Sequence, residues 1–315
     1  MFVGLILAAM VEIREIREEG LERWVGVRRA VAPSQTGTVE DFLDWARQAT
    51  QTAWLLATVD GQDAGTGHTI GGWHAPPGVA HAAVHVLQEQ RRRGVGTELL
   101  GALRRWARDA GYRELQGAVR EEDGASLAWV EARRFKEIGR ESRLALELEA
   151  VEAPAVDPPA GIRIVSWAER PELARAMYEV AREAYPDVPG QEDDAMAPFE
   201  EWLSGDMQGT SDRPEATFVA LADEEVVGYG KLALSSSRAH VAIHDIIGVR
   251  RAWRGRGIAG ALKRAEIAWA KRAGFERLET MNEERNEPIR RLNDRHGYRI
   301  EPGEVTVRGP ISGEP

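Results

Sequence analysis

An internal repeat constrains this chain more than any other feature of its sequence. The residues from Val86 to Phe135 match those lying 163 positions later, without a gap. Identities fall at residue types that chance rarely aligns in one register, among them Arg91 with Arg254, Gly94 with Gly257, Trp106 with Trp269, and Gly111 with Gly274. A solenoid is excluded, because its repeats span only about 20–50 residues. The sequence therefore predicts two copies of one domain.

The chain is long enough for each copy to have a core of its own. Its 315 residues exceed the roughly 100–200 residues of a typical domain. Residues 153–161 carry three prolines and show no hydrophobic periodicity, which is typical of an extended linker. We therefore expect an N-terminal domain over residues 1–152 and a C-terminal domain over residues 160–315.

The order of predicted elements is the same in the two copies. Several short strands are followed by a strand, a helix, a strand, a second helix and a closing strand. In the second copy, Val241–Val249 is rich in Val, Ile and Ala and predicts a buried strand. After it, apolar residues at helical spacing predict a helix packed on a sheet, namely Ile258, Leu262, Ala265 and Trp269. This order predicts the α/β class, with an α+β mixed sheet and helices on both faces.

The composition excludes several kinds of site. Without cysteine, the chain forms no disulfide, thiolate metal site or cysteine nucleophile. The seven histidines show none of the spacings of metal-binding motifs, so we expect no metal. The formal net charge of −10 argues against nucleic acid as a partner, since nucleic acid is bound by neutralising its phosphates. The same charge is compatible with a cationic amine as substrate.

Two segments of the sequence bear on the localisation of the protein and on its partners. The apolar segment Met1–Met10 is too short to span a bilayer as a helix and lacks the features of a secretory signal. We expect a leading strand there, no membrane partner, and a cytoplasmic monomer or homodimer. The acidic segment at residues 191–194 lies between predicted helices, where a solvated loop is favoured over a cation-selecting one.

Both copies place small residues where the buried strand becomes the helix, in the pattern R-x-x-G-x-G/A. The first turn of a helix has free N–H groups and the positive end of the helix dipole, and small residues let a pyrophosphate approach them. The candidate binding residues of the second copy are Val249, Arg254, Gly255, Arg256, Gly257, Ile258 and Ala259. Those of the first copy are Val86, Arg91, Arg93, Gly94 and Gly96. A dinucleotide fingerprint and a P-loop need glycine patterns that neither copy has.

With this turn, its repeat and its context, the sequence resembles the GNAT acyltransferases, and within them the tandem arrangement of mycothiol synthase-like proteins. The likeness covers both halves and is densest at residues 249–259 and 286–298. It implies acetyl-CoA as co-substrate, with its pyrophosphate on the turn and its pantetheine arm beside the strand that ends at Val249. It also implies that Asn286, which opens the last helix, contacts CoA.

The resemblance further implies direct attack of an amine on the thioester, often aided by a Glu base on the strand and a Tyr acid on the last helix. The base position falls on Ile243 and the acid position on Asn293, so neither usual residue is present. Asp245 and His244 lie beside the base position, and with Asn293 they are our candidate catalytic residues. Under strict alternation Asp245 shares a face with Val249, whereas a bulge would reverse this.

The two copies are not equivalent. The repeat offset pairs His244 with His81, which favours a packing role for this histidine. Asp123 stands where the second copy has Asn286, and a carboxylate is a poorer neighbour for a pyrophosphate than an amide. We therefore expect the second domain to be active and the first to be degenerate.

The sequence thus favours an acetyl-CoA-dependent N-acetyltransferase that acts on a primary amine of a small molecule. Two alternatives stay open. One is a protein or peptide N-acetyltransferase. The other is a non-catalytic acetyl-CoA-binding protein, which the missing Glu and Tyr favour.

Overall fold

The computed structural model describes residues 10–33, 37–72, 75–188, 196–234 and 237–312. The expected leading strand at residues 1–9 and the acidic segment at 191–194 lie outside the described residues. The chain forms two compact units. Unit 1 consists of residues 1–119, 123–138 and 306–315, and unit 2 of residues 120–122 and 139–305. Over the described ranges, no helix has the length and apolar character needed to cross a membrane.

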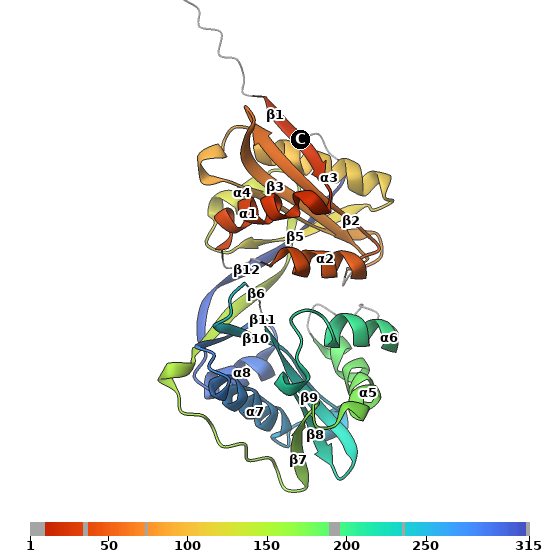
Figure 1. Ribbon diagram of the computed structural model, residues 1–315, viewed down its shortest axis with the longest axis vertical. Coiled ribbons are helices and arrows are strands. Elements are labelled where there is room, and N and C mark those ends of the chain that lie inside the picture. Colours follow the sequence, from red (N-terminus) through yellow and green to blue (C-terminus); the bar gives the residue numbers. More distant parts are fainter. Residues whose placement is uncertain (1–9, 34–36, 73–74, 189–195, 235–236, 313–315) are drawn as a thin grey trace, which may run out of the picture. The chain divides into compact units, whose positions relative to one another are not determined.

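Unit 1 is a mixed sheet with helices on both faces (Figure 1). In spatial order its strands are β1 (Val11–Ile16), β2 (Gln51–Val59), β3 (Gln62–Gly71), β4 (Val79–Val86), β5 (Glu114–Arg120) and the end of β12 (Arg299–Pro310). One face is covered by α1 (Leu21–Val31) and α2 (Val39–Gln48), and the other by α3 (Val95–Asp109) and α4 (Gly124–Glu131).

Unit 2 repeats this architecture. Its strands are, in spatial order, the start of β12, β6 (Lys136–Glu147), β11 (Arg277–Glu283), β10 (Val241–Val249), β9 (Glu225–Leu234), β8 (Thr217–Ala222) and β7 (Ile162–Ser166). One face is covered by α5 (Ala174–Ala184) and α6 (Phe199–Trp202), and the other by α7 (Ile258–Arg272) and α8 (Glu287–Arg295). The predicted α/β class with a mixed sheet is confirmed.

The structure reproduces the sequence repeat almost residue for residue. Among the strands and α-helices, four pairs have both bounds 163 residues apart: β3 with β9, α3 with α7, β5 with β11, and β6 with β12. Within α7, Ile258, Leu262 and Ala265 are at most 3% exposed, as the predicted stripe requires. Burial of Ile258 and of Leu262 each contributes about 1.5–3 kcal/mol to the free energy of folding, because their apolar surface is removed from water. Trp269, at the end of the stripe, is half-buried.

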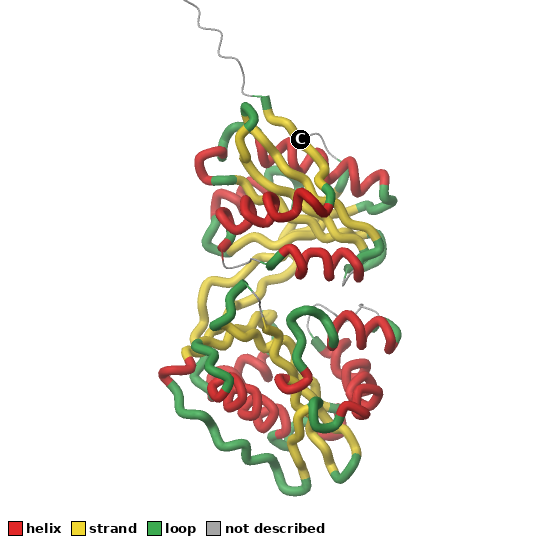
Figure 2. Tube along the Cα trace, viewed as in Figure 1, coloured by secondary structure: helices red, strands yellow, loops and turns green. Residues whose placement is uncertain are grey.

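The last strand of each repeat, β6 or β12, is divided between the two units. Most of β6, which ends the first repeat, belongs to unit 2, and residues 306–310 of β12, which ends the second repeat, belong to unit 1. Residues 151–161 run as a loop within unit 2 (Figure 2). The compact units therefore divide the chain at other places than residues 152 and 160, and the division of the repeats there stays a prediction.

The tail of β12 completes unit 1, and this gives a first prediction. The Arg308 guanidinium donates to Gln116 Oε1 at 2.7 Å, and the Ile311 N–H donates to the Arg113 carbonyl at 3.2 Å. We expect a chain that ends at Val305 to leave β5 with an unpaired edge and a destabilised unit 1. Hydrogen exchange would then show lost amide protection in β5, whereas a chain that ends at Ser312 keeps it. Unchanged protection in the shorter chain would contradict this view.

Candidate functional site

Two parallel strands part near the centre of unit 2. Strands β10 and β11 pair at Val241–Arg277, Ala242–Leu278 and Ile243–Glu279, and their pairing ends there. In unit 1, β4 and β5 part in the same way after His81–Gln116. Beyond these points each strand pair leaves backbone groups without a partner strand, next to the start of α7 or α3. In open α/β sheets, ligands bind at such carboxyl ends of strands.

The turn between β10 and α7 leaves an exposed helix N-terminus. Gly255 and Gly257 have φ of 73° and 86°, a region that side chains rarely adopt. No side chain caps α7, so its first N–H groups stay available to a ligand. A methyl group built on Gly255 would meet nothing within 4 Å, so the surface over the turn is open. Ile258 anchors the helix in the core at 1% exposure, and Ala259 is half-buried beside it.

The arginines of this turn have different tasks. Arg254 donates from Nε to the carbonyl of Val249 at 2.9 Å, and its Nη1 lies 2.7 Å from Asp187 Oδ2. Arg251 also binds Asp187, and its hydrogen bond is the main cause that lowers the Asp187 pKa to about 2. Arg256 packs over Trp253 at 4.6 Å, and no described acid pairs with it. Arg254 therefore fixes the turn, while Arg256 keeps a charge for an anionic ligand.

The corresponding turn of unit 1 is less suited to an anion. Gly94 keeps a φ of 87°, but Arg92 has a φ of 64° where unit 2 has a glycine, at a cost of about 1–2 kcal/mol. Arg91 donates to the Val86 carbonyl at 3.4 Å, as Arg254 does in unit 2. Arg91 Nη1 also lies 3.9 Å from the Asp123 carboxylate, and Arg93 Nη2 lies 3.3 Å from Asp60. A carboxylate thus compensates the positive charge of each of these two arginines.

The residues that open the last helices also differ. Asp123 caps α4 by accepting from the Ser126 N–H at 3.0 Å and from the Ser126 hydroxyl at 2.8 Å. Asn286 opens α8 without any side-chain capping bond. Its amide is therefore open to a ligand. Gly96, the counterpart of Ala259, faces Trp129, whose ring would lie 3.4 Å from an added Cβ.

A bulge in β10 changes which face each residue occupies. The pairing of β10 with β9 shifts between His244 and Ile246, which leaves Asp245 unpaired. His244 therefore shares the α7 face with Val249 and contacts Glu266 of that helix. The prediction from strict alternation, which placed Asp245 on the face of Val249, is wrong, and the bulge is the reason.

The bulge also changes how the copies correspond. Strand β4 pairs with β3 without a shift. Ile243 lies opposite Glu279 as His81 lies opposite Gln116, so Ile243 is the counterpart of His81. The prediction that His244 corresponds to His81 is therefore wrong for the folded structure. The counterpart of His244 is Ala82.

Asp245 is held by a buried cation. Its side chain is 48% exposed, and its Oδ2 lies 3.1 Å from Lys231 Nζ. The same ammonium lies 2.6 Å from Asp212 Oδ1 and donates to the Asp206 carbonyl. Burial opposes the charge of Lys231, but Asp245 and Asp212 outweigh it and raise the pKa of this lysine. Asp245 is thus a fixed carboxylate that solvent can reach.

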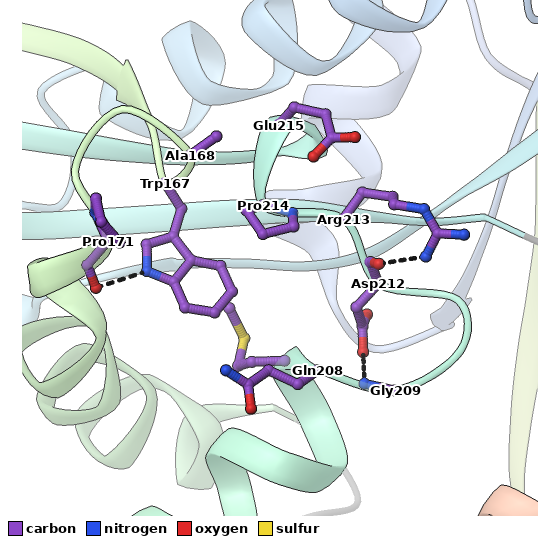
Figure 3. A pocket seen from close by; sticks show the side chains of 10 residues that line it. Trp167, Ala168, Pro171, Gln208, Gly209, Asp212, Arg213, Pro214 and Glu215 are labelled. Atoms are coloured by element: carbon purple, nitrogen blue, oxygen red, sulfur yellow. Dashed lines mark hydrogen bonds between the residues drawn. The ribbon is translucent and has the colours of Figure 1, made fainter.

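A pocket of about 640 Å³ lies next to Asp212. In Figure 3, the Trp167 indole donates to the Pro171 carbonyl at 3.2 Å, and Asp212 accepts from the Gly209 N–H at 2.9 Å. Glu215 adds a second carboxylate to the lining. Through Asp212 and Lys231 the pocket is linked by ion pairs to Asp245.

A cluster of buried polar side chains lies under α7, and we call it the core cluster. It consists of His244, Lys263, Glu266, Asn293 and Tyr298, each at most 5% exposed. His244 Nδ1 lies 2.8 Å from Glu266 Oε2, and its Nε2 is hydrogen-bonded to the Tyr298 hydroxyl. Lys263 donates to Asn293 Oδ1 at 2.6 Å, and the Asn293 amide donates to Asn282 Oδ1 at 2.6 Å.

Burial shifts the titration of this cluster. It raises the pKa of Glu266 to about 8 and lowers that of Lys263 to about 8. It also holds the pKa of His244 well below its usual value. Burial thus disfavours the charged form of all three groups. Asn293 is completely buried and, as an amide, does not act as an acid.

Sequence reasoning missed Lys263, Glu266 and Lys231. Lys263 and Glu266 follow the apolar stripe of α7, but charged residues on a helix are expected at its surface. The signal that would have found them is the repeat, because Leu100 and Leu103 stand at the same positions of α3. Within the described part of the chain, no group of three or more His, Asp or Glu side chains is arranged to hold a metal.

The raised pKa of Glu266 predicts a pH-dependent stability. The folded state keeps the Glu266 proton up to about pH 8, whereas the unfolded chain releases it near its ordinary pKa of 4.5. Stability therefore falls as pH rises through this window. Relative to wild type, Glu266→Gln should gain up to about 1.4 kcal/mol of unfolding free energy per pH unit.

Urea unfolding at about pH 5.5 and 7.5 measures this gain. Histidines that do not contact Glu266 contribute alike to both proteins, so their effect cancels in the difference, and glutamine keeps a hydrogen-bonding group beside His244. An identical pH dependence for wild type and variant would show that Glu266 is ionised when folded.

Comparison with known proteins agrees with this geometry. Two aminoglycoside N(6')-acetyltransferases of type 1 are similar to part of the chain. The protein from Salmonella enteritidis is 29% identical over 141 residues, which are 41% of this chain and 94% of the relative. The protein from Stenotrophomonas maltophilia is 26% identical over 150 residues, which are 46% of this chain and 98% of the relative.

Two solved structures share the whole fold. One is a GCN5-related N-acetyltransferase from Sphaerobacter thermophilus, with a TM-score of 0.75, 23% identity and 97% of both chains covered. The other is a tandem GNAT protein from the clavulanic acid biosynthesis pathway, with a TM-score of 0.78, 18% identity, and 97% of this chain and 100% of the other covered. The model of the acetyltransferase (GNAT) family matches residues 10–134 and 174–298. Since these matches cover both repeats and more than half of the chain, the protein belongs to the acetyltransferase (GNAT) family and contains two such domains in tandem.

Proposed function

We propose that unit 2 transfers the acetyl group of acetyl-CoA to a primary amine of a small molecule. The observation that carries this proposal is the open N-terminus of α7 directly after the parting of β10 and β11. Its N–H groups and Arg256 suit the pyrophosphate, and Asn286 is open to the same ligand. The backbone of β10 beyond Ile243 is available to the pantetheine arm.

The reaction needs few groups of the protein. The amine nitrogen attacks the thioester carbonyl carbon, so that a C–N bond forms and the C–S bond breaks. Sulfur leaves with the electron pair as a thiolate and takes a proton from solvent. The amine gives up its own proton to a base. Holding the two reactants together supplies much of the acceleration.

Asp245 is our candidate for that base. It lies on β10 two residues beyond the last pair with β11, its carboxylate reaches solvent, and Lys231 fixes its position. His244 points into the core cluster, where the Glu266 carboxyl and the Tyr298 hydroxyl occupy both of its ring nitrogens. It is therefore less suited to take a proton from an incoming amine.

The class of acceptor follows from charge and from the relatives. An amine substrate is a cation before it loses its proton, and the chain carries a net charge of −10. The relatives are named as aminoglycoside N(6')-acetyltransferases. An aminoglycoside is therefore the first acceptor to try.

Acetyl-CoA binding tests the turn. Ala259→Glu places a carboxylate beside the α7 N-terminus, where it favours the helix but repels a pyrophosphate. We expect calorimetric titration of acetyl-CoA to show lost binding for this variant and retained binding for Gly96→Glu, its counterpart in unit 1. Binding that survives Ala259→Glu, or a wild-type protein that does not bind, would overturn the proposal.

Acetylation of an aminoglycoside tests the base. We expect Asp245→Asn to lower kcat about 100-fold, which is within the usual range for the loss of a general base, with little change in the KM for acetyl-CoA. Asp109→Asn, at the exposed end of α3, serves as the control. If Asp245→Asn retains full kcat, Asp245 has no part in the mechanism.

A further inference from the structure

The two copies differ most in the cores beneath their long helices. Every member of the core cluster replaces an apolar residue of unit 1. Lys263 stands in the place of Leu100, Glu266 in that of Leu103, Asn293 in that of Val130, Tyr298 in that of Phe135, and His244 in that of Ala82. At these five positions unit 1 thus packs with aliphatic and aromatic side chains, although its α3 buries Arg104 nearby, over the ring of Phe135.

Stability does not account for the core cluster. A buried ammonium or carboxyl loses its hydration, and well-packed apolar residues in its place are often neutral or stabilising. Glu266 is completely buried, and its Oε1 has no hydrogen-bond partner among the described residues. Burying these five polar side chains therefore costs folding free energy that the apolar residues at the same positions of unit 1 avoid. Such a cost is typical of residues that serve function.

The core cluster lies where β10 and β11 part. His244 follows the last paired residue of β10, and Thr280 follows that of β11. The Thr280 hydroxyl donates to the His244 carbonyl at 3.3 Å, directly behind the parting. Asn293 reaches β11 from α8 through Asn282, further along the opening. The buried cluster thus packs against the parting strands on the side of α7 and α8.

Lys263 is the cation of the core cluster and contacts two of its other members. Its ammonium is 1% exposed, donates to Asn293 Oδ1 and lies 4.8 Å above the ring of Tyr298. A cation bound to an amide oxygen sets the direction of the amide and strengthens its N–H groups as donors. The other groups around it are Glu266, His244 and His296. The Glu266 carboxyl contacts His244, and no carboxylate among the described residues forms an ion pair with the Lys263 ammonium.

We propose that Lys263 is a positioning residue for the leaving group: it fixes the amide of Asn293 and places a buried positive charge beside the opening, where both stabilise the thiolate of departing CoA. This inference rests on the proposed function of unit 2 and deepens it. When the C–S bond breaks, the negative charge on sulfur is stabilised by the field of the Lys263 ammonium and of the amide dipole that it orients, and no proton from the protein is required. A fixed donor at a developing anion is among the largest single effects in catalysis.

The test replaces Lys263 by the leucine that unit 1 carries. We expect Lys263→Leu to fold and to melt no earlier than wild type, while its kcat for aminoglycoside acetylation falls about 100-fold. The KM for acetyl-CoA should stay within about threefold, since the interaction arises as the thiolate forms. Asn293→Val should have a similar effect, and the double variant should be no worse than either single one.

The matched control is Ile267→Val, which removes one methylene from the buried face of the same helix. It should lower stability slightly and leave kcat unchanged, so that a mere disturbance of the core is told apart from the loss of charge. If Lys263→Leu keeps wild-type kcat, the proposal is wrong.

A second measurement does not depend on the acceptor. The ultraviolet absorbance of the thiolate gives the pKa of the thiol of CoA bound to the protein. We expect this pKa to lie below that of free CoA in wild type and to return toward it in Lys263→Leu. An unshifted thiol pKa in wild type, or one that Lys263→Leu leaves lowered, would overturn the role of Lys263. If the shift is present but no amine is acetylated, the role of Lys263 stands and the proposed transfer fails.

Discussion

The candidate site of unit 2 depends on the end of backbone pairing between β10 and β11. After Ile243 and Glu279 the two parallel strands stop sharing hydrogen bonds, and strand groups become available to a ligand. The helix that starts beyond this opening presents its free N–H groups because Gly255 and Gly257 adopt left-handed conformations. The opening and the helix start together suit the extended ligand with a charged end that we propose for unit 2, acetyl-CoA.

The bulge at Asp245 gives the two sides of β10 different chemistry. One extra residue turns His244 inward, toward Glu266 and Tyr298, and leaves Asp245 at the surface with Lys231. An exposed carboxylate and the buried core cluster are thus separated by a single strand. The base and the leaving-group charge that we propose for unit 2 would thus act from opposite sides of β10.

The two repeats share one fold but have different cores beneath their long helices. Unit 1 keeps the turn and the parting strands, but its arginines are balanced by Asp123 and Asp60, and its helix packs on leucine and phenylalanine. In unit 2, ionisable side chains such as Lys263 and Glu266 replace part of those apolar residues. The backbones of the two repeats agree from β3 and β9 onward except for the bulge in β10, so most of the difference beneath the long helices lies in side chains.

The sequence by itself determined the repeat, the fold class and the turn, because each depends on local rules: a fixed residue spacing, a helical stripe and glycines at a helix start. Only the tertiary structure decided the bulge, since it depends on how β10 pairs with β9. It also decided the burial of Lys263 and Glu266, whose charge predicts a surface position until their partners on β10 and α8 are known. The exchange of β6 and β12 likewise depends on pairing between strands far apart in the chain, which no local pattern encodes.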